Sequence, residues 1–131
     1  MLQERSIAPQ AREIVPQQAN VRAQRNSTAL FGLGLIEAIP DATILANVKV
    51  LTPDGVKGKA HIVTDVVSGT QRVGRFGWKA QQATVLAFSG DAYVNEMGIT
   101  NRLFPTENAP NGDAAKLAQF DQIADPEDTT D

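Results

Sequence analysis

The sequence predicts a mainly helical fold with long loops and one small β-hairpin. Apolar residues recur at helical spacing in residues 29–39 and again in residues 79–97. Between them, two short runs rich in β-branched residues flank a Ser-Gly-Thr turn, which is typical of a hairpin. Prolines and glycines interrupt most of the remaining sequence, and a length of 131 residues suits a single domain.

The two ends of the chain differ in composition from its centre. Residues 1–25 are rich in Gln, Arg, Ala and Pro and show little periodicity, so we expect an extended or disordered arm. Residues 26–120 hold the predicted helices and hairpin. Residues 121–131 are expected to form an acidic tail or linker, because residues 106–131 contain seven acidic side chains and one basic side chain.

The segment RNSTALFGLGLIEAIP predicts a helix over residues 29–39, with Ser27 or Thr28 as its N-cap. The helix would be apolar on most sides, and such a helix is normally buried. Gly32 and Gly34 weaken it by about 1 kcal/mol each relative to alanine. We therefore expect these glycines to allow the close approach of another backbone or of a bulky ligand.

The hairpin follows a second short helix. Pro40 is suited to a first helical turn, and this helix is expected to end near Leu45. The predicted strands are Ile62–Val67 and Gln71–Phe76, with the turn between them. His61 lies at the start of the hairpin, where a surface role or a ligand role is open.

The spacing becomes helical again over residues 79–97, and Gly98 is suited to the position after a helix C-terminus. The residues predicted to share one face are Ala83, Leu86, Gly90, Tyr93, Val94 and Met97. After a loop with several prolines, DAAKLAQFDQI predicts a last short amphipathic helix with Asp113 as its cap.

The composition excludes several classes of site. The chain has no cysteine, so disulfides, thiolate metal sites and thioether-linked haem are excluded. A single histidine argues against a His-rich metal site or a Ser-His-Asp triad. The basic residues are scattered without interleaved aromatics, which argues against nucleic-acid binding. No apolar run is long enough for a membrane span or for a signal peptide.

Few side chains are candidates for chemistry. Glu96 falls at the end of an apolar helix, where burial would favour its protonated form and suit it to general acid or base work. Trp78 could be a core anchor or an electron relay. Arg75 and Lys79 flank the tryptophan and could bind a carboxylate or a haem propionate. On spacing alone, each of these residues could equally be structural.

Three motifs, RNSTALFGLGLIEAIPDATILA, GRFGWKA and EMGITNRLFPTEN, follow one another in the chain. Together they resemble the middle of the di-haem c-type oxidoreductases related to bacterial cytochrome c peroxidases, in particular the thiol oxidoreductase-like or di-haem peroxidase branch. The resemblance covers residues 22–128. It implies a cytochrome c peroxidase-like partial domain from a periplasmic enzyme. The two helical domains of such an enzyme each bind haem c through Cys-x-x-Cys-His.

The resemblance assigns roles to several residues. Trp78 matches a tryptophan that relays electrons between the two haems. Glu96, in Asn95-Glu96-Met97-Gly98, matches a glutamate that acts as acid and base over the peroxidatic haem. The residues expected near the cofactor are Asn26, Gly32, Gly34 and Arg75.

The chain also departs from the family pattern. Neither Cys-x-x-Cys-His motif is present, so this chain binds no haem covalently, and haem c is expected only in full-length relatives. The glutamine usual before the Glu-Met-Gly element is replaced by Ala87 or Phe88. A periplasmic location is expected for the relatives, whereas the chain itself shows no signal peptide.

The leading hypothesis is therefore a haem-free central segment of a di-haem peroxidase-like, electron-transferring oxidoreductase, redox-inactive alone. It would be a fragment, a split gene product or a degenerate paralogue. The alternative is a cofactor-free interaction or structural module that docks on a haem-bearing partner, either the remainder of the enzyme or a haem protein. A third hypothesis is non-covalent haem near Gly32, Gly34 and Trp78, with Met97 or His61 as axial ligand.

Overall fold

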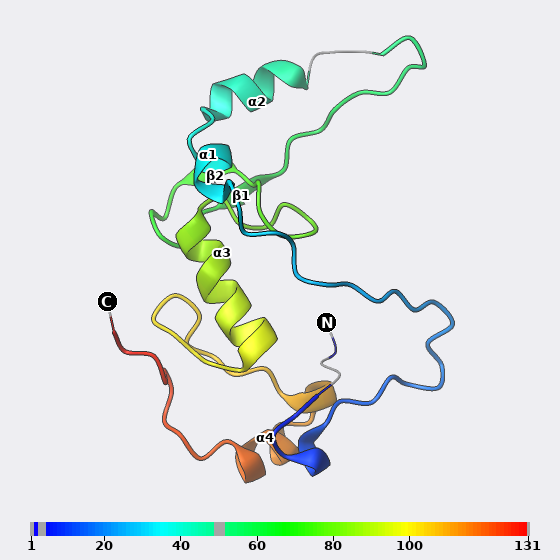
Figure 1. Ribbon diagram of the computed structural model, residues 1–131, viewed down its shortest axis with the longest axis vertical. Helices are drawn as coiled ribbons and strands as arrows, with labels where there is room; N and C mark the ends of the chain where they lie inside the picture. Colours follow the sequence, from blue (N-terminus) through cyan, green and yellow to red (C-terminus); the bar gives the residue numbers. More distant parts are fainter. Residues whose placement is uncertain (1, 3–4, 49–51, 131) are drawn as a thin grey trace. The chain divides into compact units, whose positions relative to one another are not determined.

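The computed structural model describes residues 2, 5–48 and 52–130 (Figure 1). Two compact units make up the chain, one of residues 28–89 and one of residues 1–27 together with 90–131. The regular structure of the described residues consists of short helices and a single two-stranded antiparallel sheet. The predicted fold class, mainly helical with long loops and one small hairpin, is confirmed.

The hairpin of the unit 28–89 is formed by β1 (Ile62–Thr64) and β2 (Gln71–Val73). The paired residues are Ile62 with Val73, Val63 with Arg72, and Thr64 with Gln71. Both strands are shorter than predicted, and β1 ends where the chain turns at Asp65. The Asp65 N–H donates to the Thr70 carbonyl at 2.9 Å, and the Asp65 carboxylate accepts from both the N–H and the hydroxyl of Ser68.

Asp65 also connects this turn to the next helix. Its side chain is 1% exposed and accepts a hydrogen bond from the Thr84 hydroxyl at 3.0 Å. The Thr84 oxygen in turn accepts from the Ala87 N–H at 3.2 Å and so caps the start of α3 (Val85–Ala92). Burial alone would raise the pKa of Asp65, but the hydrogen bonds from Ser68 and Thr84 outweigh it and lower the pKa.

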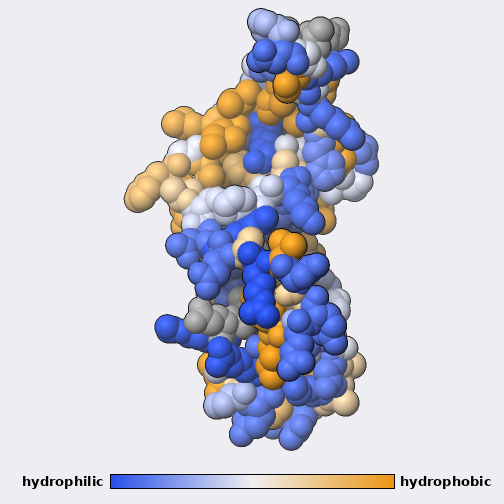
Figure 2. Space-filling model, turned by 90° about the vertical axis from the view of Figure 1, so that its right-hand side faces the viewer, coloured by the Kyte–Doolittle hydropathy of each residue, from blue (hydrophilic) through white to orange (hydrophobic). Residues whose placement is uncertain are grey.

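The first helix, α1, spans only Leu33–Glu37, and α2 spans Asp41–Asn47 after Pro40. Gly32 has φ of +80° at the N-cap of α1, and this left-handed backbone keeps the helix from extending upstream. The predicted burial of this segment is wrong in this structure, because its large apolar side chains are exposed (Figure 2). These side chains are Leu30, Phe31, Leu35, Ile36 and Ile39.

The predicted helix 79–97 is divided into three parts. Residues 79–84 form turns and bends, α3 follows, and a π-helix spans Tyr93–Met97. Gly98 ends it in the left-handed region at φ 67°, as the sequence predicts. No helix in the described part of the chain is long and apolar enough to cross a membrane.

The predicted buried face of this helical segment is confirmed only in part. Ala83 and Ala87 are fully buried and Val94 is 6% exposed, whereas Leu86, Tyr93 and Met97 are about half exposed. Small residues lie where the packing is tightest: a Cβ at Gly90 would stand 3.0 Å from Asn101 Oδ1. Shape, rather than apolar size, therefore selects the inward face.

In the other unit, the N-terminal segment is paired through the side chain of Asn111. The Asn111 amide accepts from the Ile14 N–H at 2.7 Å and donates to the Ile14 carbonyl at 3.0 Å. Glu13 accepts from the Asn111 N–H at 3.1 Å. Asp113 caps α4 (Ala114–Phe120) as predicted.

Thr100 binds the acidic C-terminal segment of this unit. Its side chain is fully buried, and its hydroxyl donates to Asp125 and accepts from the Glu127 N–H at 3.0 Å. The Thr100 N–H donates to the Glu127 carboxylate at 3.0 Å, and the Thr100 carbonyl accepts from the Asp128 N–H at 2.9 Å. Residues 125–128 are thus fixed along Thr100.

Candidate functional site

Glu96 lies in the π-helix and is exposed rather than buried. Its Oε2 accepts a hydrogen bond from the Ser27 hydroxyl at 2.7 Å, across 69 positions of sequence. Short π-helical segments are rare and occur frequently at functional sites. A carboxylate on such a segment, oriented by a hydroxyl, can hold or transfer a proton.

The backbone around Glu96 is fixed by contacts on both sides. Asn95 donates to the Asp91 carbonyl at 2.9 Å and to its carboxylate at 3.0 Å, and the Asn108 amide donates to Asn95 Oδ1 at 3.2 Å. After the glutamate, the Gly98 N–H donates to the Val94 carbonyl. The position of the Glu96 backbone is therefore set by its neighbours.

Trp78 lies in the turn that follows β2, just after Gly77 with φ of +80°. Its side chain is 57% exposed, so the core role is not the one that this structure shows. Trp78 belongs to the unit 28–89 and Glu96 to the other unit. The electron-relay role of Trp78 stays a prediction.

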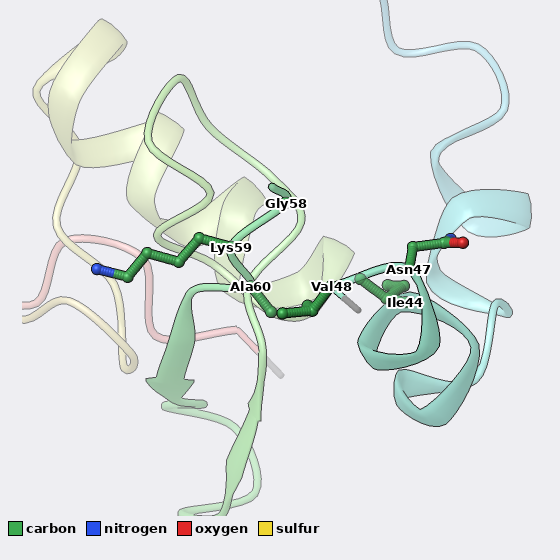
Figure 3. A pocket seen from close by; sticks show the side chains of 6 residues that line it. All are labelled: Ile44, Asn47, Val48, Gly58, Lys59 and Ala60. Atoms are coloured by element: carbon green, nitrogen blue, oxygen red, sulfur yellow. The ribbon is translucent and has the colours of Figure 1, made fainter. Parts of the chain in front are cut away.

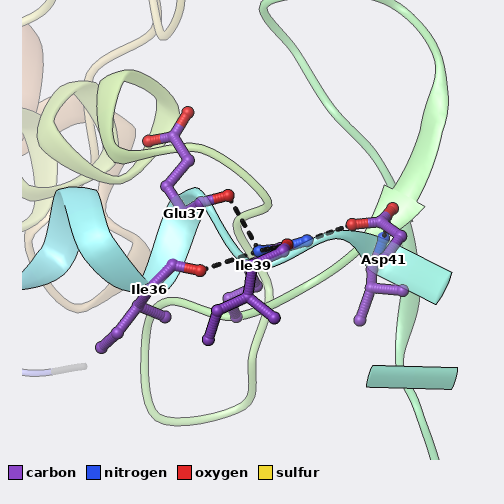
Figure 4. Close-up of polar contacts among 6 residues, drawn as sticks. Ile36, Glu37, Ile39 and Asp41 are labelled. Atoms are coloured by element: carbon purple, nitrogen blue, oxygen red, sulfur yellow. Dashed lines mark hydrogen bonds and ion pairs between the residues drawn. The ribbon is translucent and has the colours of Figure 1, made fainter. Parts of the chain in front are cut away.

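Arg75 is almost completely buried and binds the end of α1. The exposed fraction of its side chain is 2%, and its guanidinium donates to the carbonyls of Ile36 and Glu37 at 2.8 and 3.0 Å. It also donates to the Ile39 carbonyl and pairs with Asp41, the first residue of α2 (Figure 4). In this structure the Arg75 guanidinium therefore links the end of α1 to the start of α2. The predicted contact between Arg75 and a cofactor stays a prediction.

Asp41 completes this cluster. Its second oxygen, Oδ2, accepts from the Val73 N–H of β2 at 2.9 Å. That backbone hydrogen bond, together with the Arg75 guanidinium, lowers the pKa of Asp41 despite partial desolvation. Glu37 makes a comparable contact, because its Oε2 accepts from the Val85 N–H at the start of α3 at 2.8 Å. One arginine and two carboxylates therefore fix α1 and α2 to the rest of their unit.

The other predicted cofactor-binding residues are open to approach. A Cβ added at Gly32 or at Gly34 would meet no atom within 4 Å, and the apolar side chains beside them are exposed. Asn26 is also exposed and precedes Ser27 in the other unit. The structure leaves these surfaces accessible, and their contact with a cofactor stays a prediction.

A small pocket lies between the end of α2 and the segment before β1 (Figure 3). Its volume is about 170 Å³, below the roughly 300–1,000 Å³ of typical small-molecule sites. The residues that line it are Ile44, Asn47, Val48, Gly58, Lys59 and Ala60. This pocket therefore does not fit a haem.

The described residues do not form a haem site by themselves. His61 Nδ1 lies 3.0 Å from the Lys79 carbonyl oxygen, so one ring nitrogen is already engaged with this chain. Met97 is 55% exposed and belongs to the other unit. Among residues 2, 5–48 and 52–130, no group of three or more metal-binding side chains occurs. Within the described residues, neither His61 nor Met97 provides an enclosed axial ligand for haem.

The mainly helical fold and the order of the three motifs agree with a haem-dependent class of oxidoreductases. A family model described as "Di-haem oxidoreductase, putative peroxidase" matches residues 10–118, which is most of the chain. The chain therefore belongs to the di-haem oxidoreductase family, as the resemblance predicts. No curated protein and no solved structure matched it.

Sequence reasoning missed the residues that organise these sites. Ser27 appeared only as a helix cap, yet its hydroxyl binds Glu96. Asp41 and Thr100 carried no local signal, because their tertiary partners lie 25 to 34 positions away, and the bond from Thr84 to Asp65 spans 19 positions. Only the folded backbone brings these groups within hydrogen-bond distance.

Proposed function

We propose that this chain is the haem-free central segment of a di-haem peroxidase-like, electron-transferring oxidoreductase, and that it has no redox activity alone. The family match over residues 10–118 supports the first part. The second part follows from the sequence, which contains no cysteine for thioether attachment. In such an enzyme the haem groups supply the redox chemistry.

The observation that carries the proposal is the position of Glu96 and the hydrogen bond to its carboxylate. The carboxylate lies on a π-helical turn, accepts a hydrogen bond from Ser27 at 2.7 Å, and follows the anchored Asn95. This arrangement suits a group that holds and transfers a proton. We assign Trp78, whose indole is 57% exposed, the role of electron relay.

The first experiment is expression of the chain in a host that matures c-type haem. We expect no covalent haem stain and no Soret band after acid–acetone extraction. Any covalent haem would contradict the proposal. We further propose a periplasmic location, on the strength of the resemblance, and cell fractionation of the native source tests it.

The second experiment tests the proposed roles of Glu96 and Trp78 in a haem-bearing protein that contains this segment. Glu96→Gln is expected to lower peroxide turnover by about 100-fold or more, since general acid–base catalysis contributes about 10²–10⁴-fold. Trp78→Phe should slow electron transfer between haems while peroxide binding persists. Asp54→Asn, a change at an exposed turn residue, is the matched control. Unchanged turnover in Glu96→Gln would remove the proton role.

The exposed apolar surface beside α1 favours a second candidate function, a module that docks on a haem-bearing partner. Phe31 is 97% exposed and Leu35 is 79% exposed, and contiguous apolar surface of this kind commonly marks an interface. Phe31→Ser with Leu35→Ser should weaken copurification with that partner. Val56→Ser, a change at another exposed apolar residue, should not. Docking through this surface would be contradicted if the chain were a stable monomer and the Phe31/Leu35 double variant copurified with the partner as well as Val56→Ser does.

A further inference from the structure

We propose that Ser27 is a positioning residue for Glu96. Its hydroxyl holds the Glu96 carboxylate in the orientation in which the glutamate handles a proton. This inference rests on the proposed acid–base role of Glu96. The direct observation is the hydrogen bond from Ser27 Oγ to Glu96 Oε2 at 2.7 Å.

The contact is tertiary rather than local. Ser27 and Glu96 are 69 positions apart, so no turn or helix cap brings them together. Both residues belong to the unit formed by residues 1–27 and 90–131. The segment that carries Ser27 therefore reaches the π-helix across the chain and meets it at its carboxylate.

The backbone alone does not determine where the carboxylate points. Asn95 is held by Asp91 and Asn108, and the Ile99 N–H closes back on the Tyr93 carbonyl at 3.0 Å. These contacts fix the Cα position of Glu96. The exposed side chain retains its rotamers, and ordering a glutamate costs free energy. The Ser27 hydroxyl selects one orientation.

A hydroxyl is chemically suited to this task. It donates to Oε2 in this structure, and it can go on donating to the same oxygen when a proton is bound at Oε1. Ser27 can therefore stay hydrogen-bonded to Glu96 in both protonation states, and its neutral hydroxyl adds no charge beside the carboxylate. Because Oε2 is engaged, we expect the proton to be transferred at Oε1.

The first test uses the chain itself and needs no haem. NMR of side-chain carboxylates gives the Glu96 ¹³Cδ shift in H₂O and in D₂O. A hydrogen bond from an exchangeable hydroxyl produces an isotope shift. We expect that shift in the wild type and in Ser27→Thr, and its loss in Ser27→Ala. Thr28→Ala, which removes the neighbouring hydroxyl, should retain it.

An unchanged isotope shift in Ser27→Ala would overturn the contact. Backbone amide spectra separate this outcome from misfolding, because the Ala variant should alter signals only around residues 26–28 and 93–98. A spectrum changed throughout the unit would instead make Ser27 a structural residue and would equally overturn the inference. Ser27→Thr should restore the wild-type shift.

The second test uses the haem-bearing protein that contains this segment. Ser27→Ala is expected to lower kcat for peroxide about tenfold, with KM unchanged, as expected for loss of one hydrogen bond to a charged group. In a Glu96→Gln background, the same change should cause no further loss. An additive loss would overturn the positioning role. If Glu96→Gln itself has no effect, the proposed function fails, while the NMR result still decides whether Ser27 orients the side chain.

Discussion

Each of the two units is stabilised internally, and the kind of polar contact that does so differs between them. In residues 28–89, a buried arginine joins carbonyl groups at the end of α1 to Asp41, while the apolar side chains of α1 remain exposed. In the unit of residues 1–27 and 90–131, two neutral side chains make the corresponding long-range hydrogen bonds. Asn111 binds the N-terminal segment and Thr100 binds the acidic one.

The difference shows in the carboxylates of the two units. Hydrogen bonds to Val73 N–H and to Arg75 hold the pKa of Asp41 below its ordinary value. The pKa of Glu107 is raised, mainly by burial and further by the negative charges of Glu127 and Asp125. One unit thus stabilises a charge by pairing it, and the other places like charges close together. The variants below test this contrast.

The largest effect is expected from Arg75→Leu. Removing one partner of a buried ion pair costs about 3–5 kcal/mol, because Asp41 and three carbonyl groups lose their donor. Chemical denaturation with hydrogen exchange should show lost protection within residues 28–89. Arg75→Lys keeps the charge but not the planar fork, and should be intermediate. Lys57→Leu, a change of an exposed cation, is the control. If Arg75→Leu and Lys57→Leu were equally stable, the buried arginine would not be what stabilises the unit 28–89.

Thr100→Val should have the next largest effect. The change keeps the shape but removes the hydroxyl, leaving the Glu127 N–H without its acceptor, at a cost of about 1–3 kcal/mol. We expect faster amide exchange and faster proteolysis at residues 125–128. Thr106→Val, at an exposed threonine, serves as the control. If both variants release the segment equally, Thr100 does not hold it.

A smaller and opposite pair of effects is expected with pH. Asp41 has a folded pKa below 3.8, so its contribution to stability is present above pH 3.8 and is lost as the pH falls through the folded value. Glu107 has a folded pKa above 4.5, so its contribution is fully present below pH 4.5 and is lost as the pH rises through the folded value.

Two amide variants separate these contributions. Asp41→Asn should destabilise the chain at neutral pH and flatten its loss of stability in acid. Glu107→Gln should stabilise it at neutral pH by less than about 1 kcal/mol, since the carboxylate is only partly buried and solvent screens its charge. Thermal unfolding between pH 3 and 7 measures both. The same sign for the two variants at pH 7 would contradict the contrast.

The smallest effect is expected from Phe31→Ser. The side chain is 97% exposed, so the free energy of unfolding should change by less than about 0.5 kcal/mol. Denaturant unfolding of the isolated chain measures this change, with Phe76→Ser as the buried counterpart. Phe76 is 4% exposed and stacks on Phe88 at 5.9 Å between ring centroids. A large loss of stability in Phe31→Ser would mean that the segment leading into α1 is buried in solution.

Local signals in the sequence predicted much of the fold. The Ser-Gly-Thr turn, the cap Asp113 and the end at Gly98 each depend on residues within a few positions, and each is confirmed. The extent of α1 was wrong because Gly32 adopts a left-handed conformation. The buried face of α3 was wrong because close contact selected Ala87 over the larger Leu86.

The candidate site was predictable only in part. The motif around Glu96 marked the glutamate, but not its exposure, its π-helical turn or its bond to Ser27. Those depend on which distant segments meet, and periodicity carries no such information. The same limit applies to Arg75: its spacing left an anion-binding role and a structural role open, and only the folded chain shows its guanidinium donating to the carbonyls at the end of α1.

The pairing of Asn111 with Ile14 has a consequence for the order in which the chain acquires its structure. The two residues are 97 positions apart, so most of the 131-residue chain lies between them. Contacts of such high sequence separation form late, because the entropy of closing the loop must be lost before the contact gains anything. During synthesis, the N-terminal arm must therefore wait until residue 111 has emerged, whereas the unit 28–89 can begin to fold earlier.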